Sequence, residues 1–194
     1  MKLENLYKKK SLTDYIVYIS VLIGGILIDQ FTKWLVVQNM ELYEHIPVIR
    51  FGDTTIASLL HIRNDGAAFG MLDNAPWVFN TISTVAIIAM TVYLFLGHTD
   101  SLLSGIALSM LISGGIGNMI DRISLQYVVD FIYLDIIKFA IFNGADSFVC
   151  VGAGLLMLSL ILEMKKEMQN EKLKKAASAV GESATDEADK GDES

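Results

Sequence analysis

The chain has 194 residues, of which 53% are hydrophobic, and its formal net charge is -7 at pH 7. That length fits one domain of ordinary size. The hydrophobic share and a mean hydropathy of +0.46 exclude a typical soluble domain and indicate a membrane protein. The lone cysteine, Cys150, excludes a disulfide within the chain.

The predicted fold class is a mainly α-helical membrane protein with four transmembrane helices. Four long apolar stretches each approach the ~20 helical residues that cross about 30 Å of hydrocarbon. The spans are expected at about residues 15–37, 77–96, 102–121 and 147–163, within a membrane domain of residues 15–165. The other segments are a basic lead-in at 1–14, two extracytoplasmic segments at 38–76 and 122–146, and a charged tail at 166–194.

The distribution of lysine and arginine predicts that both termini are cytoplasmic. Three lysines at 8–10 precede the first span and five more, within 165–175, follow the fourth, and basic residues near spans mark the cytoplasmic side. The tail beyond about Gln169 holds much of the negative charge and few large apolar residues. It is therefore expected to be disordered or at most a frayed helix.

Between the first two spans, the composition predicts a small strand-and-turn structure. Short apolar runs from Glu41 to Leu72 are separated by Pro47, Gly52 and Asp53, which is typical of strands and turns. The segment ends in Asn64-Asp65-Gly66, a turn signal followed by small residues that allow a close backbone approach. Taken alone, this pattern indicates a hairpin turn.

Charged residues within the apolar stretches form two groups. Asp29 and Lys33 stand at i and i+4 in the first span, which favours a structural ion pair facing protein. Asn118, Asp121 and Arg122 fall on one face of the third helix. That second group fits either a structural network or a site that binds a backbone carbonyl or an anionic group.

Two further acids, Asp130 and Asp146, come to the same membrane boundary. The stretch between Asp130 and Asn143 alternates apolar residues with Asp135 and Lys138, which predicts a short amphipathic helix on the membrane surface. Two acids held close share a proton, so that one takes a proton from water while the other polarises a peptide carbonyl. The alternative is two acids that merely cap helices. The three histidines and one cysteine lack metal-site spacing, so no metal or cofactor is expected.

Five motifs, in this order and topology, resemble the lipoprotein signal peptidase (signal peptidase II) family of bacteria. They are Asp29-Gln-Phe-Thr-Lys33, Arg63-Asn-Asp-Gly-Ala-Ala-Phe-Gly70, Gly117-Asn-Met-Ile-Asp-Arg122, Val128-Val-Asp-Phe-Ile132 and Phe142-Asn-Gly-Ala-Asp146. The resemblance covers roughly residues 15–165. It implies four transmembrane helices, a small extracytoplasmic β-cradle and a surface helix.

The resemblance also implies an aspartic endopeptidase of the bacterial cytoplasmic membrane, with its active site toward the extracytoplasmic face. Such an enzyme removes signal peptides from prolipoproteins by cleaving just before the cysteine that carries diacylglycerol. The implied partners are lipid-modified prolipoproteins and membrane phospholipid, with no nucleic acid and no cofactor, and the enzyme is expected to act as a monomer.

By matching motif, the resemblance implies three classes of site residue. Asp130 and Asp146 are the expected catalytic pair. The residues expected to bind substrate or order the two acids are Asn64, Gly66, Asn118, Arg122 and Asn143. The residues expected to give structural support are Asp29, Lys33, Asp121 and Ala145.

Two other function classes compete with a peptidase. A small polytopic transporter or channel would use Asp29, Lys33, Asp121 and Arg122 as an ion path, but it predicts acids near the midplane and often repeated halves. A non-enzymatic assembly factor would use the glycine-rich third span for helix packing. It predicts that isosteric neutral changes at Asp130 are tolerated.

Overall fold

We analysed a computed structural model of the chain, which describes residues 10–65, 76–97, 99, 101–137 and 139–190. The side chains of 76, 77, 79 and 174–190 are outside this description. The chain divides into two compact units, Met1–Leu156 and Met157–Ser194. The first unit contains the sheet and all of the site residues considered below.

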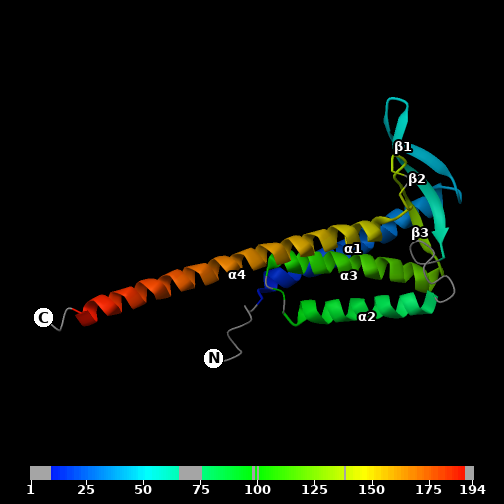
Figure 1. The fold of residues 1–194 in the computed structure, drawn as a ribbon. Coiled ribbons are helices and arrows are strands. Elements are labelled where there is room, and N and C mark those ends of the chain that lie inside the picture. Colours follow the sequence, from blue (N-terminus) through cyan, green and yellow to red (C-terminus); the bar gives the residue numbers. More distant parts are fainter. Residues whose placement is uncertain (1–9, 66–75, 98, 100, 138, 191–194) are drawn as a thin grey trace. The chain divides into compact units, whose positions relative to one another are not determined.

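Four helices account for most of the described residues (Figure 1). They are α1 (Leu12–Asn39), α2 (Pro76–Phe95), α3 (Leu102–Ser124) and α4 (Gly144–Lys190). Three segments of the described chain are long and apolar enough to cross a membrane: Leu12–Asn39, Leu102–Ser124 and Gly144–Leu173. The described apolar part of α2, Asn80–Phe95, is shorter. The prediction of a mainly helical membrane protein is thus confirmed, with three candidate spans.

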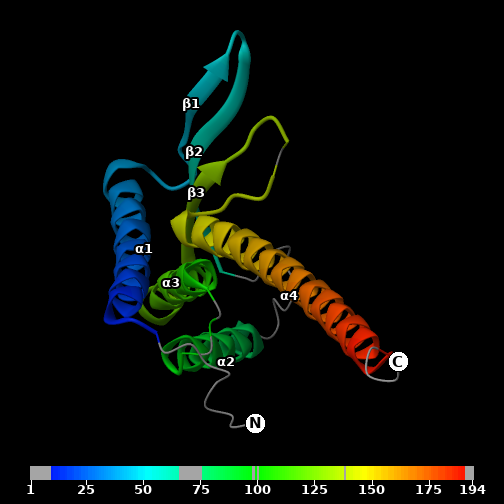
Figure 2. The ribbon, with the colours of Figure 1, turned by 90° about the vertical axis from the view of Figure 1, so that its left-hand side faces the viewer.

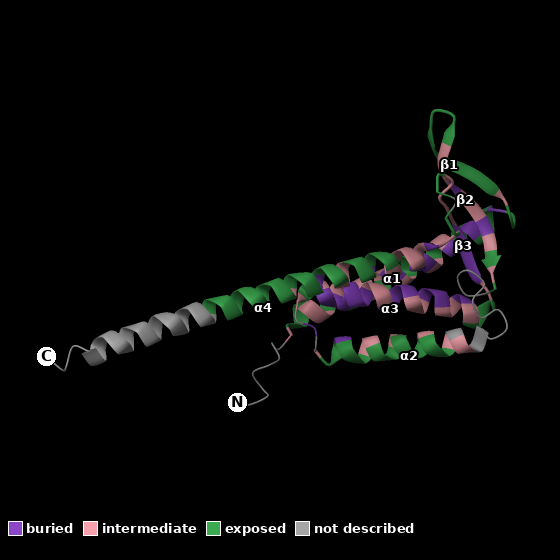
Figure 3. Ribbon diagram, viewed as in Figure 1, coloured by how far each residue is buried: buried purple, intermediate pink, exposed green. Residues whose placement is uncertain are grey.

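Helix α3 is the central helix of the first unit. It packs against both α1 and α2, and its glycines allow close approach. A Cβ on Gly114 would collide with the Ala145 carbonyl oxygen of α4, so only glycine fits there. Figure 3 shows the buried residues concentrated along α3 and β3. The outer faces of α1 and α2 expose many large apolar side chains, as expected where lipid is the solvent.

A three-stranded antiparallel sheet lies next to the helices in the first unit (Figures 1 and 2). Its strands β1 (His45–Phe51), β2 (Thr54–Asn64) and β3 (Val128–Tyr133) follow that order across the sheet. The first two confirm the predicted strand-and-turn region. In the register of β2 and β3, Ile62 pairs with Asp130 and Asn64 pairs with Val128, which brings Asn64 beside Asp130.

The predicted surface helix between Asp130 and Asn143 is not helical in its described residues. Its first part is the end of β3, followed by a turn at 135–137 and a bridge between Ile132 and Phe142. The carbonyl of Phe142 accepts hydrogen bonds from the backbone N–H groups of Phe131 and Ile132, at 3.0 and 2.8 Å. Pairing across strands takes the backbone groups that a helix would need, and this outweighs the amphipathic pattern.

In the second unit, α4 continues to Lys190, although the tail from about Gln169 was expected to be disordered or frayed. The alanine, lysine and glutamate of this segment have high helix propensity. The low content of large apolar residues is therefore compatible with a helix.

Candidate active site

Asp130 is held in the middle of β3 with 1% of its surface exposed. Its two carboxyl oxygens accept one amide hydrogen bond each. Asn64 of β2 donates from Nδ2 to Oδ2 at 2.8 Å, and Asn143 donates from Nδ2 to Oδ1 at 2.7 Å. Its strand neighbours Val129 and Phe131 are also buried, so the carboxyl group is largely removed from water.

Burial raises the pKa of Asp130 from its ordinary value of 3.8 to about 6. Removal from water disfavours the charged form, and the negative charge of Asp146 acts in the same direction. The hydrogen bonds from Asn64 and Asn143 and the positive charge of Lys33 oppose this rise in pKa without cancelling it. Asp130 is therefore able to hold a proton at a pH where an ordinary aspartate has released it.

Asp146 has a different environment, in the first turn of α4. Its Oδ2 accepts the backbone N–H of Asn143 at 3.1 Å, while its own backbone N–H donates to Asn143 Oδ1 at 3.0 Å. This reciprocal pair caps the helix. Asn118 of α3 donates from Nδ2 to Asp146 Oδ1 at 2.7 Å. A helix N-terminus and two donors are a setting that stabilises a negative charge.

Asn143 connects the two acids. Its fully buried side chain donates from Nδ2 to Asp130 Oδ1, and also lies 3.0 Å from Asn118 Oδ1. Its backbone N–H and side-chain oxygen bind Asp146. One asparagine therefore touches both carboxyl groups, which come from β3 and α4.

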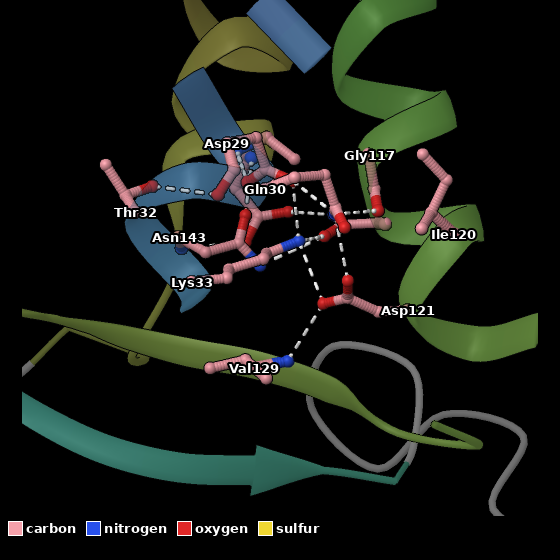
Figure 4. A network of polar contacts seen from close by, with 12 residues as sticks. Asp29, Gln30, Thr32, Lys33, Gly117, Ile120, Asp121, Val129 and Asn143 are labelled. Atoms are coloured by element: carbon pink, nitrogen blue, oxygen red, sulfur yellow. Dashed lines mark hydrogen bonds and ion pairs between the residues drawn. The ribbon is translucent and has the colours of Figure 1, made fainter. Parts of the chain in front are cut away.

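A buried polar network lies directly beside this pair (Figure 4). Lys33 of α1 forms ion pairs with Asp29 at 2.8 Å and Asp121 at 3.0 Å, and donates to Asn118 Oδ1 at 2.9 Å. Asp29 accepts the backbone N–H of Ala145 at 2.7 Å, and Asp121 Oδ2 accepts that of Val129 at 3.1 Å. The i and i+4 pair expected from the sequence is formed and extends to α3.

Gln30 belongs to the same network, although sequence reasoning gave it no role. Its Nε2 donates to Gly117 O at 3.1 Å and Asp121 Oδ1 at 2.9 Å, and lies 3.2 Å from Asp29 Oδ2. The signal was available, because a residue three before Lys33 lies on a neighbouring part of the same helical face.

The remaining predicted residues are less fully defined. Arg122, at the end of α3, is within electrostatic range of Asp146, Asp130 and Asp121. Ala145 is fully buried next to Asp29. Gly66 lies outside the described residues. In the described part of the chain, no group of three or more histidine, cysteine or acidic side chains has an arrangement that would hold a metal ion.

Comparisons with known proteins agree with this architecture. A family model described as signal peptidase (SPase) II matches residues 21–162. A lipoprotein signal peptidase of Halalkalibacterium halodurans is 41% identical over 152 residues, which covers 77% of this chain and 95% of that protein.

Two solved structures, each described as a bacterial membrane enzyme, have the same fold as this chain. The first has a TM-score of 0.71 and 29% identity, and covers 83% of this chain and 95% of its own. The second has a TM-score of 0.67 and 30% identity, and covers 80% of this chain and 97% of its own.

Proposed function

Because this chain belongs to the signal peptidase II family, a family of proteases that mature bacterial lipoproteins, we propose that Asp130 and Asp146 cleave the signal peptide. The observation that carries this assignment is the pair of carboxyl groups bound to one asparagine, Asn143. Two acids with such different surroundings suit the two halves of an acid–base reaction.

In the proposed reaction the acids share one proton. The ionised acid takes a proton from a water molecule, whose oxygen attacks the peptide carbonyl carbon. The protonated acid hydrogen-bonds to the carbonyl oxygen and supplies the proton that it needs as charge develops. The acid that took the proton from water then gives it to the amide nitrogen, while the other acid takes back a proton from a hydroxyl of the tetrahedral intermediate. The intermediate collapses to a carboxylic acid, the C–N bond breaks and the amine leaves, so that the two acids again share one proton. No covalent bond to the protein forms.

The substrate is a prolipoprotein already modified with diacylglycerol, cut just before the lipidated cysteine. Asn64 and Arg122, which lie beside the acids, would bind the substrate backbone, and Gly66 follows Asn64 in the same motif. Acyl chains would contact the exposed apolar faces of the helices, where burial contributes about 0.8 kcal/mol per methylene. The enzyme acts as a monomer surrounded by phospholipid.

The proposed topology has α2 as a fourth span, both termini in the cytoplasm and the two acids at the outer boundary. The lysines at 8–10 and 165–175 support this orientation. The sheet then lies outside the membrane as the β-cradle that holds the peptide. A substrate that diffuses within the bilayer would reach acids at that boundary without leaving its lipid anchor.

The test is cleavage of a diacylglyceryl-modified prolipoprotein by purified wild type, Asp130→Asn and Asp146→Asn in detergent. Asp53→Asn is the matched control, since this acid is exposed in the turn between β1 and β2. We expect both site variants to lose at least about 10³-fold in kcat while still giving a cooperative thermal melt. The control should cleave like wild type. Cleavage by either folded site variant at the wild-type rate would refute the assignment.

A second measurement tests the role of the lipid. A precursor whose cysteine carries no diacylglycerol should be cleaved far more slowly than the modified one, because it lacks the acyl contacts. Equal rates for the two precursors would show that recognition rests on the peptide.

A further inference from the structure

Lys33 uses its three N–H donors on three different partners. The ammonium group contacts Asp29 Oδ2 at 2.8 Å, Asp121 Oδ2 at 3.0 Å and Asn118 Oδ1 at 2.9 Å. Its side chain is 4% exposed, so these contacts replace water. A lysine ammonium has three donors and no acceptor, and this geometry satisfies all three within the protein.

Each partner of Lys33 leads to one of the two acids. Asp29 binds the backbone N–H of Ala145, the residue before Asp146. Asp121 binds the backbone N–H of Val129, the residue before Asp130. The third partner, Asn118, contacts the Asp146 carboxylate itself. A single cation therefore lies two contacts from the Asp146 carboxylate, through Asn118. It also lies two contacts from the backbone N–H of the residue before Asp130, through Asp121.

The Asn118 amide has only one orientation that suits its neighbours. Its oxygen faces two donors, Lys33 Nζ at 2.9 Å and Asn143 Nδ2 at 3.0 Å, and its nitrogen faces Asp146 Oδ1 at 2.7 Å. If the amide were flipped, its N–H₂ group would face an ammonium and its oxygen would face a carboxylate. Both contacts would be repulsive in a buried site.

We propose that Lys33 is a positioning residue for the reaction: it locks the Asn118 amide with its nitrogen toward Asp146 and so gives Asp146 the anionic role. This inference rests on the proposed function, since it takes Asp130 and Asp146 as the reacting acids. It goes beyond structural support, because it assigns Asp146 as the acid that takes the proton from water. Asp130 is then the protonated acid that polarises the carbonyl.

The surroundings of the two acids agree with this division. Asp146 caps α4 and accepts a backbone N–H as well as the Asn118 amide. Asp130 lies within the sheet and is 1% exposed, and the partners that the structure defines for its carboxyl oxygens are two side-chain amides. Its raised pKa supports its role as the acid that holds the proton.

Replacing Lys33 alone is a poor test, since it would leave Asp29 and Asp121 as unpaired buried charges, which is strongly destabilising. The better variant is the triple change Asp29→Asn, Lys33→Met and Asp121→Asn. The new amide oxygens can still accept from Ala145 and Val129, and methionine fills much of the lysine's volume. The matched control is the single change Asp121→Asn, which keeps Lys33 paired with Asp29 and donating to Asn118.

We expect the triple variant to fold, as judged by a cooperative melt in detergent, but to cleave about 10²-fold more slowly in kcat than Asp121→Asn. KM for the lipidated precursor should change by less than about twofold, because Lys33 does not contact substrate in this proposal.

The proposal is overturned if the triple variant and Asp121→Asn have equal kcat, since Lys33 is then only structural. Should the triple variant fail to fold, Asn118→Asp provides the second test. In its ionised form it keeps oxygens for Lys33 and Asn143 but has no N–H to donate to Asp146. A folded Asn118→Asp enzyme that cleaves like wild type would also overturn the proposal, whereas loss of kcat with unchanged KM supports it.

These outcomes are separate from those of the proposed function. If Asp130→Asn and Asp146→Asn are inactive while the triple variant matches its control, only the role of Lys33 is wrong. If the two aspartate variants are active, the assignment of the reacting acids fails first.

Discussion

At both ends of the α1–α3 helix pair, a side chain of α1 packs against a glycine of α3, but the two contacts differ in chemistry. At one end the ring of Tyr18 fits against Gly105 in an apolar cluster with Leu94, Leu108 and Ile112. At the other end the carboxylate of Asp29 fits against Gly117. In both places a side chain of α1 occupies the space that a Cβ on α3 would take.

The difference lies in what each contact contributes. The apolar end gains stability from packing, whereas the polar end places Asp29, Lys33 and Asp121 in a site where charges lose hydration. Buried ion pairs often stabilise a fold no better than apolar residues of similar volume. The polar end is therefore best explained by what it holds in position, which is the strand and helix that carry Asp130 and Asp146.

Among the substitutions that test the difference between the two ends, Gly117→Ala should have the largest effect. A Cβ at this position would lie 2.5 Å from Asp29 Oδ2 and 3.2 Å from the Ala145 Cβ, so the carboxylate must move. Displacement of Asp29 disturbs the start of α4, and we expect kcat to fall about 10²-fold with a loss of about 1–3 kcal/mol in unfolding free energy. Cleavage assays and thermal melting measure both.

The matched variant is Gly105→Ala, whose Cβ would collide with the Tyr18 ring. It should lose a similar free energy of unfolding but keep kcat per folded molecule, because the clash is in the apolar cluster. If both alanine variants lost kcat equally, the two ends would not be functionally distinct.

The comparison of the two ends also shows what the sequence can and cannot reveal. The Asp29–Lys33 pair was predictable because an i and i+4 spacing fixes proximity within one helix. The three-way contact of Lys33 was not, since Asn118 and Asp121 approach it only after α1 and α3 pack. Gly117 belongs to one of the five motifs and to the glycine-rich third span, but nothing in the sequence indicated that Asp29 would pack against it.

The acids illustrate the same limit in the sheet. The motifs indicated Asp130 and Asp146, but the stretch after Asp130 has the pattern of an amphipathic helix. That stretch begins as β3 because its backbone pairs with the edge of β2 that β1 does not cover, where Asp130 lies opposite Ile62. Hydrogen bonding with a distant strand overrode the local periodicity, and it is this pairing that brings Asn64 to Asp130.

A second prediction sharpens the contrast between the two acids through pH. The pKa of Asp130 is raised to about 6 in the folded protein, so the folded state keeps a proton that the unfolded chain releases. This contribution to stability is fully present below about pH 4 and is lost as pH rises through 6. Above pH 6, the buried ionised form of Asp130 lowers the free energy of unfolding by on the order of 3 kcal/mol relative to the protonated form.

Asp130→Asn removes this destabilisation but loses one of the two hydrogen bonds that its carboxyl oxygens accept from Asn64 and Asn143. Its stability relative to wild type should therefore be higher at pH 7.5 than at pH 4.5. Asp146→Asn should have a free energy of unfolding about 0.5–2 kcal/mol lower than wild type at pH 7.5, because its new amide nitrogen cannot accept the Asn143 N–H that caps α4. Thermal melts in detergent at pH 7.5 and pH 4.5 measure the direction of the stability change in each variant. A difference in stability between Asp130→Asn and wild type that is the same at both pH values would contradict the raised pKa of Asp130.

The smallest effect is expected at the apolar end, from Tyr18→Phe. The Tyr18 hydroxyl is buried and has no hydrogen-bond partner among the described residues, unlike the polar groups around Lys33. Since an unsatisfied buried hydroxyl is destabilising, its removal should leave stability unchanged or raise it by up to about 1 kcal/mol, with kcat unaltered. The cleavage assay and a melt on the same sample measure this. A Tyr18→Phe enzyme that melted clearly lower would mean that this hydroxyl has a partner, and that the apolar end also depends on a hydrogen bond to hold α1 against α3.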